Sequence, residues 1–247
     1  MKLYVGTSGY SYPEWKGYFY PEDLPQTEML RYYGERLHSV EINNTFYRLP
    51  KASLLEGWAK QVPAEFRFSI KASQKITHIK RLKNAGDETT YLFKTVETMG
   101  EKLGVILFQC PPNLKKDLPR LEEFLKNVPR GPMVALEFRH ATWCDEETFS
   151  CLRGRDCALC IADTDEELEV PFVSTGTWGY LRLRRPDYLK ADLQKWRKKI
   201  EDQSWEEAFV FFKHEDKGVG AKLALDFMKM GISGAEKKEI KKGEKKS

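Results

Sequence analysis

The sequence contains no long hydrophobic run. No apolar stretch approaches the ~20 residues that a helix needs to cross a bilayer. The first residues, MKLYVGTSGY, also lack the apolar segment of a secretory signal. We therefore expect a cytoplasmic protein without a membrane partner.

Histidine is scarce, and its spacing does not suggest a metal centre. The chain has four histidines and no HExxH or HxH motif. This pattern argues against a multi-metal site, and we expect neither a bound metal nor another cofactor. One ion held by His140, His214 and a carboxylate remains an alternative. The GxGxxG, Walker and GxSxG motifs are absent too.

Cysteine is present in an odd number, five, in a chain without an export signal. We therefore expect free thiols rather than disulfides. Cys157 and Cys160 form a CxxC motif, but the segment CALCIAD has the pattern of a strand. Residues three apart in a strand point to opposite faces, so this pair is predicted to be structural and not a chelate.

Net charge is small once the C-terminus is set aside. The formal charge is +4, and residues 235–247 hold six Lys and three Glu, which supply +3 of it. We predict that this Lys/Glu-rich tail is disordered and that residues 1–234 form one domain. The nearly neutral body gives little support for nucleic-acid binding from global charge.

Eight apolar runs are present, with helical patterns between them. The runs cover residues 3–9, 39–46, 67–73, 104–112, 133–140, 158–164, 178–185 and 208–216. Helical patterns cover residues 27–37, 53–62, 88–103, 118–128, 146–154, 188–202 and 221–231. This alternation predicts an α/β fold, a single (β/α)8 TIM-type barrel whose sixth helix is short or missing. An open doubly wound sheet is the competing fold, but eight near-equal units favour closure.

Most of these runs end in polar residues, which a barrel brings together at its C-terminal face. The two-residue period places Glu41 and Asn43 on the interior phase of the second strand. By the same argument Glu137 and Arg139 point inward from the fifth strand, and Arg182 and Arg184 from the seventh. The eighth strand is apolar on both phases, so the sequence leaves Lys213 and His214 as alternatives.

This mouth predicts a catalytic and an anion-binding function. Glu41 and Glu137 are the expected catalytic pair, as acid and base or as acid and nucleophile. The inward cations outnumber the carboxylates, which suggests a phosphate or carboxylate ligand. The expected substrate-binding residues are Tyr10, Asn43, Tyr47, Lys71, Arg139, His140, Trp143, Asp163, Arg182, Arg184 and His214.

Two structural alternatives remain open at this point. The charges can simply pair with one another, for example Glu41 with Arg182 and Glu137 with Arg139, since an unpaired buried charge is prohibitive. The aromatic residues of the first loop, residues 8–21, can either stack on a ligand or pack the loop down.

Several blocks resemble one known family. The segments GTSGYSYPEWKGYFYP, VEINNTFYRLP, FRFSIKASQKITH, LGVILFQCPPNL and VALEFRHATW are similar to domain-of-unknown-function family seventy-two, the YecE-like proteins. The resemblance implies a TIM-like barrel without an established activity. It also implies a likeness in fold to endonuclease IV, whose metal cluster needs more histidines than this chain has. At the end of the seventh strand Arg184 stands where the family pattern has a histidine.

Together these observations predict an enzyme, a hydrolase or lyase, that acts on an anionic substrate such as a phosphoester or sugar phosphate. The alternative is a non-catalytic protein that binds a nucleic acid or nucleotide through the same cations and the aromatic loop.

Overall fold

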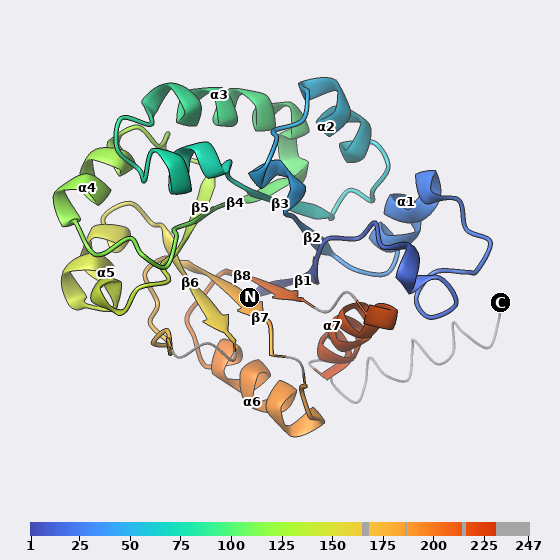
Figure 1. Cartoon of the computed structure of the whole chain (residues 1–247). Helices are drawn as coiled ribbons and strands as arrows, with labels where there is room; N and C mark the ends of the chain where they lie inside the picture. The colour runs from blue at the N-terminus through green and yellow to red at the C-terminus, as the bar shows by residue number, and fades with distance from the viewer. Residues whose placement is uncertain (165–167, 186, 214–215, 231–247) are drawn as a thin grey trace.

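The computed structural model is a closed barrel of eight parallel strands in sequential order, with helices outside the strands (Figure 1). It describes residues 1–164, 168–185, 187–213 and 216–230. The strands are β1 Lys2–Ser8, β2 Ser39–Ile42, β3 Arg67–Lys71, β4 Leu103–Gln109, β5 Met133–Glu137, β6 Ala158–Asp163, β7 Trp178–Leu183 and β8 Glu207–Phe212. The predicted barrel is confirmed.

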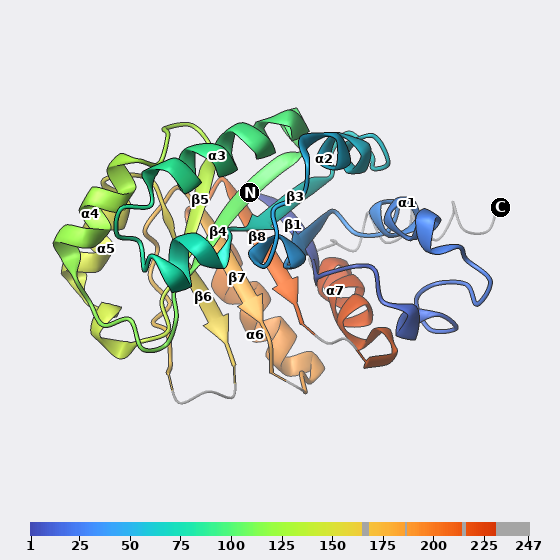
Figure 2. The same ribbon diagram turned by 45° about the horizontal axis from the view of Figure 1, so that its top comes forward.

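The helices follow the strands along the chain and cover the outside of the barrel (Figure 2). They are α1 Met29–Gly34, α2 Ala52–Ala59, α3 Gly86–Val96, α4 Leu118–Lys126, α5 Glu146–Arg153, α6 Lys190–Glu201 and α7 Val219–Met230. Between β6 and β7 the described residues, 164 and 168–177, contain no helix. This agrees with the predicted gap, and α6 therefore follows β7.

Local sequence explains where two of these helices begin. The side chain of Asp117 accepts a hydrogen bond from the backbone N–H of Arg120 before α4, and Pro119 occupies the first turn. Asp145 accepts in the same way from the N–H of Thr148 before α5. Such N-caps satisfy backbone donors that have no partner inside the helix.

All eight strands end earlier than the apolar runs that predict them, as β2 and β5 illustrate. The run 39–46 leaves the sheet after Ile42, and Asn44–Phe46 form a 3-10 turn. The hydroxyl of Thr45 explains the break, because it lies within hydrogen-bonding distance of the carbonyl oxygens of both Ile42 and Lys71. Likewise the run 133–140 leaves the sheet after Glu137, before the 3-10 turn Ala141–Trp143.

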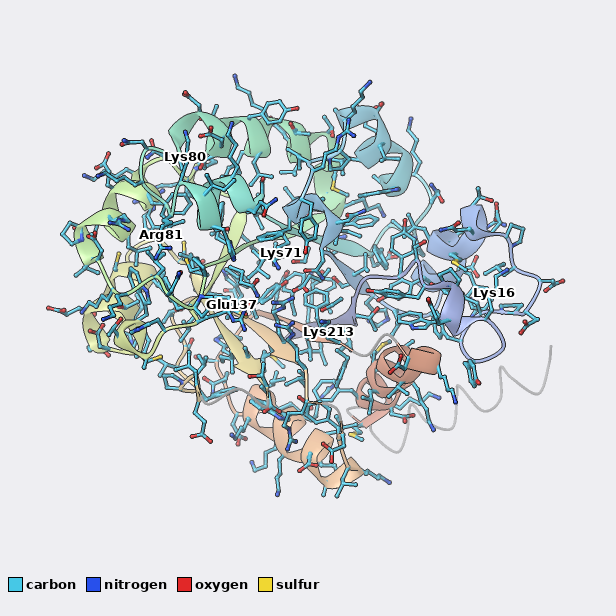
Figure 3. All side chains as sticks on the ribbon, in the orientation of Figure 1. Lys16, Lys71, Lys80, Arg81, Glu137 and Lys213 are labelled. Atoms are coloured by element: carbon cyan, nitrogen blue, oxygen red, sulfur yellow. The ribbon has the colours of Figure 1, made fainter. Side chains whose placement is uncertain are left out.

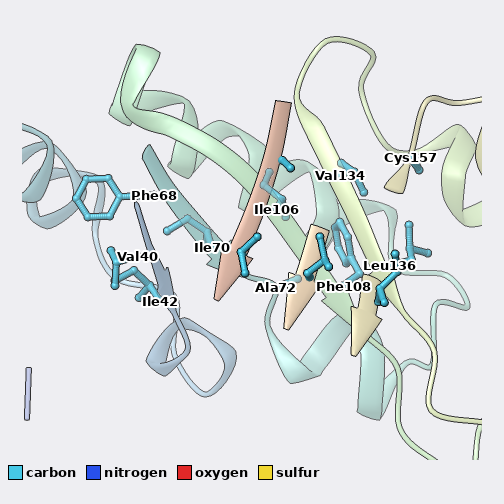
Figure 4. Close-up of a cluster of buried hydrophobic side chains, with 14 of the residues drawn as sticks. Val40, Ile42, Phe68, Ile70, Ala72, Ile106, Phe108, Val134, Leu136 and Cys157 are labelled. Carbon is cyan, nitrogen blue, oxygen red and sulfur yellow. The ribbon is translucent and has the colours of Figure 1, made fainter. Parts of the chain in front are cut away.

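The apolar core has two parts, one outside and one inside the barrel. Outward side chains of the strands pack beneath the helices, and those labelled in Figure 4 include Val40, Ile42, Phe68, Ile70, Ile106, Phe108, Val134 and Leu136. The inner cluster comprises Tyr4, Val105, Leu107, Ala135, Ala158, Cys160, Trp178, Tyr180, Phe209 and Phe211. Its large rings fill the N-terminal part of the interior, where Tyr4 stacks on Phe209 at 4.7 Å.

Other predictions concern the cysteines, membrane-spanning helices and the C-terminal tail. All five cysteines are free. Cys157 belongs to the outer cluster and Cys160 to the inner one, which confirms that they face opposite sides. Among the described residues no helix is long and apolar enough to cross a membrane. The tail 235–247 lies outside the described residues, so its disorder stays a prediction.

Closure between β1 and β2 depends on a glycine. Gly6 pairs in register with Ser39, and a Cβ atom at position 6 would lie 1.8 Å from the Ser39 carbonyl oxygen. Because that oxygen belongs to the backbone of a paired strand, Gly6→Ala should destabilise the protein by at least about 1–3 kcal/mol. Urea denaturation measures the change.

Gly57 provides the matched control for this substitution. It lies in α2, and a Cβ there would meet no atom within 4 Å. Gly57→Ala should therefore stabilise by about 0.5–1 kcal/mol, the usual gain of helix propensity. A Gly6→Ala protein that unfolds at the wild-type urea concentration would contradict this account of barrel closure.

Candidate functional site

One arginine organises the C-terminal part of the barrel interior. Arg182 extends from β7, donating from Nη2 to Glu41 Oε1 on β2 at 2.7 Å and from Nη1 to Glu137 Oε2 on β5 at 2.6 Å. All three side chains are at most 2% exposed. The expected Glu41–Arg182 pair is therefore present, and Glu137 joins the same guanidinium.

Four donors surround the Glu41 carboxylate. Besides Arg182, Oε1 accepts from Ser8 Oγ at 2.8 Å and from Asn43 Nδ2 at 3.0 Å, and Oε2 accepts from the Tyr180 hydroxyl at 2.6 Å. Burial alone would raise the pKa of Glu41. The charge of Arg182 and these hydrogen bonds outweigh burial and lower the pKa to about 2. Glu41 is therefore ionised at neutral pH.

Glu137 has a similar environment. Gln109 Nε2 donates to its Oε1 at 2.8 Å, and Arg184 Nη1 lies 4.0 Å from the same oxygen. Burial opposes ionisation, but the charges of Arg182 and Arg184 prevail and the pKa of Glu137 is lowered. Both carboxylates thus lack a proton to donate at neutral pH. Each accepts a hydrogen bond from Arg182 and holds its guanidinium in place.

A pocket of about 220 Å³ opens at the ends of β1, β2, β3, β7 and β8. Its lining residues are Ser8, Tyr12, Asn43, Phe46, Tyr47, Lys71, Arg182, Arg184 and Lys213. Four of these nine carry a positive charge, and none of those described is a carboxylate. Lys71 and Lys213 lie near the centre of the barrel in Figure 3, whereas Lys16 and Arg81 lie farther out.

Lys71 has the most perturbed amine in this pocket. Its Nζ lies 4.3 Å from the ring centroid of Phe46. Burial and the charge of Arg182 lower the pKa of Lys71 to about 8, although Glu41 and Glu137 act in the opposite direction. An amine with this pKa is partly uncharged near neutral pH.

Several residues of the pocket were not among those expected from the sequence. Ser8, Tyr12 and Phe46 line it, and so does Lys213, one of the two alternatives at the end of the eighth strand. His214 lies outside the described residues. Ser8 shares the interior phase of β1 with Tyr4 and Gly6, which is a signal that the sequence did contain.

His78 was also missed, and it lies beside the pocket. It belongs to a π-helix, Lys75–Ile79, and its ring is 4.8 Å from that of Phe46. Burial lowers the pKa of His78, and Lys71 and Arg139 add to that effect. Single-turn π-helices are frequent at functional sites.

Two expected ligand contacts are wrong for geometric reasons. Trp143 is 1% exposed, stacks on Phe138 at 4.4 Å and donates from Nε1 to the Leu114 carbonyl, so it is a core residue. Asp163 is on the outward phase of β6. Its carboxylate accepts from Tyr188 and from Trp196 of α6, away from the mouth.

Three further expected residues lie outside the pocket lining. Tyr10 is in the first loop, where its carbonyl accepts from Tyr20 and its ring lies 6.2 Å from that of Tyr33. This supports loop packing rather than stacking on a ligand. His140 caps the turn after β5, and Arg139, beyond the end of β5, is close enough to influence the pKa of Arg184.

The described residues include no group of three or more His, Cys, Asp or Glu side chains arranged to hold a metal ion. The chemistry of the pocket is instead that of its cations and hydroxyls.

The hydrogen bonds of Glu41 lead to a stability prediction. The carboxylate accepts all of these hydrogen bonds, so Glu41→Gln replaces one accepting oxygen by an N–H₂ group and removes the negative charge that faces Arg182. We expect a loss of about 3–5 kcal/mol, the cost of breaking a buried pair. Glu97→Gln, an exposed change on the surface, is the control in chemical denaturation. A loss no larger than the control's would show that Arg182 does not depend on Glu41.

The lowered pKa of Glu41 predicts a pH dependence. A depressed carboxylate pKa stabilises the fold fully above its unfolded value, 4.5, and the contribution disappears as the pH falls to about 2. The difference in unfolding free energy between wild type and Glu41→Gln should therefore shrink across this interval. A difference that stays constant would contradict the ion pair.

Comparisons with known proteins agree with this fold. A family model described as protein of unknown function DUF72 matches residues 4–245. The UPF0759 protein YunF of Bacillus subtilis (strain 168) is 24% identical over an alignment of 281 residues. This alignment covers 96% of this chain and 99% of YunF. The UPF0759 protein YecE of Escherichia coli (strain K12) is 29% identical over 139 residues, 56% of this chain and 48% of YecE.

Solved structures show the same likeness. The DUF72 family protein TM1631 of Thermotoga maritima MSB8 superposes with a TM-score of 0.82 at 27% identity, covering 93% of this chain and 99% of that one. The DUF72 family protein EF0366 of Enterococcus faecalis V583 gives a TM-score of 0.73 at 17% identity, with 94% and 98% covered. Because the DUF72 family model matches nearly the whole length of the chain, this chain belongs to the DUF72 family.

Proposed function

We propose that this protein is an enzyme, a hydrolase or lyase, that binds a small anionic substrate such as a phosphoester or sugar phosphate at the mouth of the barrel. One observation carries the proposal: the pocket lining contains Lys71, Arg182, Arg184 and Lys213 but no described carboxylate. These four cations outnumber the two buried carboxylates that face them from below, Glu41 and Glu137, and this excess of positive charge attracts an anion into the pocket.

The dimensions of the pocket support a small ligand. About 220 Å³ accommodates one phosphate or carboxylate group with a short carbon skeleton. Arg184 offers the planar fork that binds such a group with two hydrogen bonds, and Lys213 offers a point charge. The exposed ring of Tyr47, at 74%, and the ring of Tyr12 flank the rest of the cavity.

The two buried glutamates take part indirectly in this proposal. Glu41 and Glu137 hold the guanidinium of Arg182 in one orientation. A fixed cation at the mouth stabilises negative charge that develops on an oxyanion or a departing phosphate, because it need not reorganise during the reaction. We therefore assign both carboxylates to positioning Arg182 rather than to proton transfer.

Anion binding is tested by thermal unfolding. Phosphate should raise the melting temperature more than chloride at equal ionic strength. A concentration tenfold above Kd adds about 1.4 kcal/mol, and each kcal/mol shifts a chain of this size by about 2–4 °C. Arg184→Gln and Lys213→Gln should lose most of this difference.

Lys94→Gln is the matched control, because it removes one exposed positive charge from the outer helix α3. It should keep the full response to phosphate. Equal responses from all three variants would refute the pocket as the anion site.

The alternative, a non-catalytic nucleic-acid or nucleotide binder, makes a different prediction. A protein that follows a phosphate backbone through 6–10 contacts loses about 10³–10⁵ in affinity between 50 and 200 mM salt. A pocket for a single anionic group should show a much shallower dependence. Fluorescence anisotropy with a labelled single-stranded oligonucleotide measures it, and a steep salt slope would favour the alternative.

A further inference from the structure

Lys71 differs from the other cations of the pocket in how it is held. In the described part of the chain its ammonium forms neither a hydrogen bond nor a salt bridge, and its main contact is the face of Phe46 at 4.3 Å. By contrast Arg182 is bound by two carboxylates, and Arg184 lies 4.0 Å from Glu137. The Lys71 amine is thus free to react at the floor of the cavity.

The surroundings of Lys71 also disfavour its charged form. The ammonium is largely withdrawn from solvent, and the guanidinium groups of Arg182 and Arg184 repel it. Glu41 and Glu137 oppose this effect in part, but both carboxylates are bound to Arg182. Desolvation together with neighbouring cations is the environment that activates lysines as nucleophiles.

From this geometry we infer that Lys71 is a covalent nucleophile, which forms an imine with the aldehyde or ketone group of an anionic substrate. The inference rests on the proposed function and narrows its substrate class to phosphorylated or carboxylated carbonyl compounds. Arg184 and Lys213 hold the anionic group, and Lys71 attacks the carbonyl carbon within the same cavity.

The step balances without an oxidant, a reductant or a metal ion. The ammonium of Lys71 first releases a proton to water. Its nitrogen lone pair then adds to the carbonyl carbon, forming a C–N bond, and the electrons of the C=O π bond move to oxygen. Proton transfer from nitrogen to oxygen gives a carbinolamine, which takes up one proton from water and loses water. One ammonium and one carbonyl thus become one iminium and one water.

An iminium at this position suits lyase chemistry. The iminium withdraws electrons from the carbon next to the iminium carbon. A bond from that neighbouring carbon to a further substituent can then break, and its electron pair remains in the enamine that forms. Among the two reaction classes proposed above, this assignment favours the lyase.

The test uses glycolaldehyde phosphate with sodium borohydride on the full-length protein, followed by peptide mass spectrometry. Reduction converts an imine into a stable secondary amine, so the mass increase identifies the reacting lysine. We expect labelling at Lys71, at least about tenfold faster than with unphosphorylated glycolaldehyde, because binding of the phosphate positions the aldehyde. Labelling spread evenly over surface lysines, or concentrated on Lys213, would overturn the inference.

Lys71→Arg is the matched variant, because it keeps the positive charge but cannot form an imine. It should abolish specific labelling and retain the stabilisation by inorganic phosphate. Lys94→Arg, an exposed change on α3 outside the pocket, should keep labelling at Lys71. If phosphate stabilises the wild type but Lys71 is not labelled, the imine is refuted while the anion site stands. If phosphate gives no stabilisation either, the proposed function fails with it.

Discussion

The ion triad of Arg182 with Glu41 and Glu137 is the interaction on which the rest of the site depends. Moving three charges out of water is costly, and good geometry with additional hydrogen bonds offsets that cost; among the described residues only the Arg182 Nε of this triad finds no hydrogen-bond partner. The Glu41 carboxylate also accepts hydrogen bonds from Ser8, Asn43 and Tyr180, and the Glu137 carboxylate accepts one from Gln109. The triad thereby links side chains from much of the barrel wall.

The triad also sets the charge of the mouth. Both carboxylates bind Arg182 beneath the pocket, and the cations of the lining outnumber them. Lys71 and Arg184 both line the cavity, and burial and the charge of Arg182 lower the pKa of each. The anionic ligand that we propose would relieve this repulsion.

Aromatic side chains fill the N-terminal end of the barrel interior, opposite the pocket. Tyr4, Trp178 and Phe209 pack together in the N-terminal part of the barrel. These buried rings fill that end of the described barrel interior, whereas the pocket opens at the C-terminal ends of the strands. The likeness to TM1631, with a TM-score of 0.82, shows that the barrel itself is common to this family.

The sequence alone determined the barrel, its strand order and the missing helix between β6 and β7, because hydrophobic periodicity is a local property. It also placed Glu41, Glu137 and Arg182 inward, since the two-residue period of a strand decides which face a side chain takes. The period did not give the ends of the strands. The 3-10 turn at Asn44–Phe46 follows from bonds of the Thr45 hydroxyl to two different strands.

Tertiary structure alone decided which polar residues meet. Trp143 and Asp163 are residue types that often occur at binding sites. In the structure Trp143 packs on Phe138, and the Asp163 carboxylate accepts a hydrogen bond from Trp196 of α6. Lys213 lines the pocket because it continues the interior phase of Phe209 and Phe211, which the sequence concealed since both phases of β8 are apolar. Whether a buried charge serves the fold or a ligand depends on its partners, and these come from strands far apart in the chain.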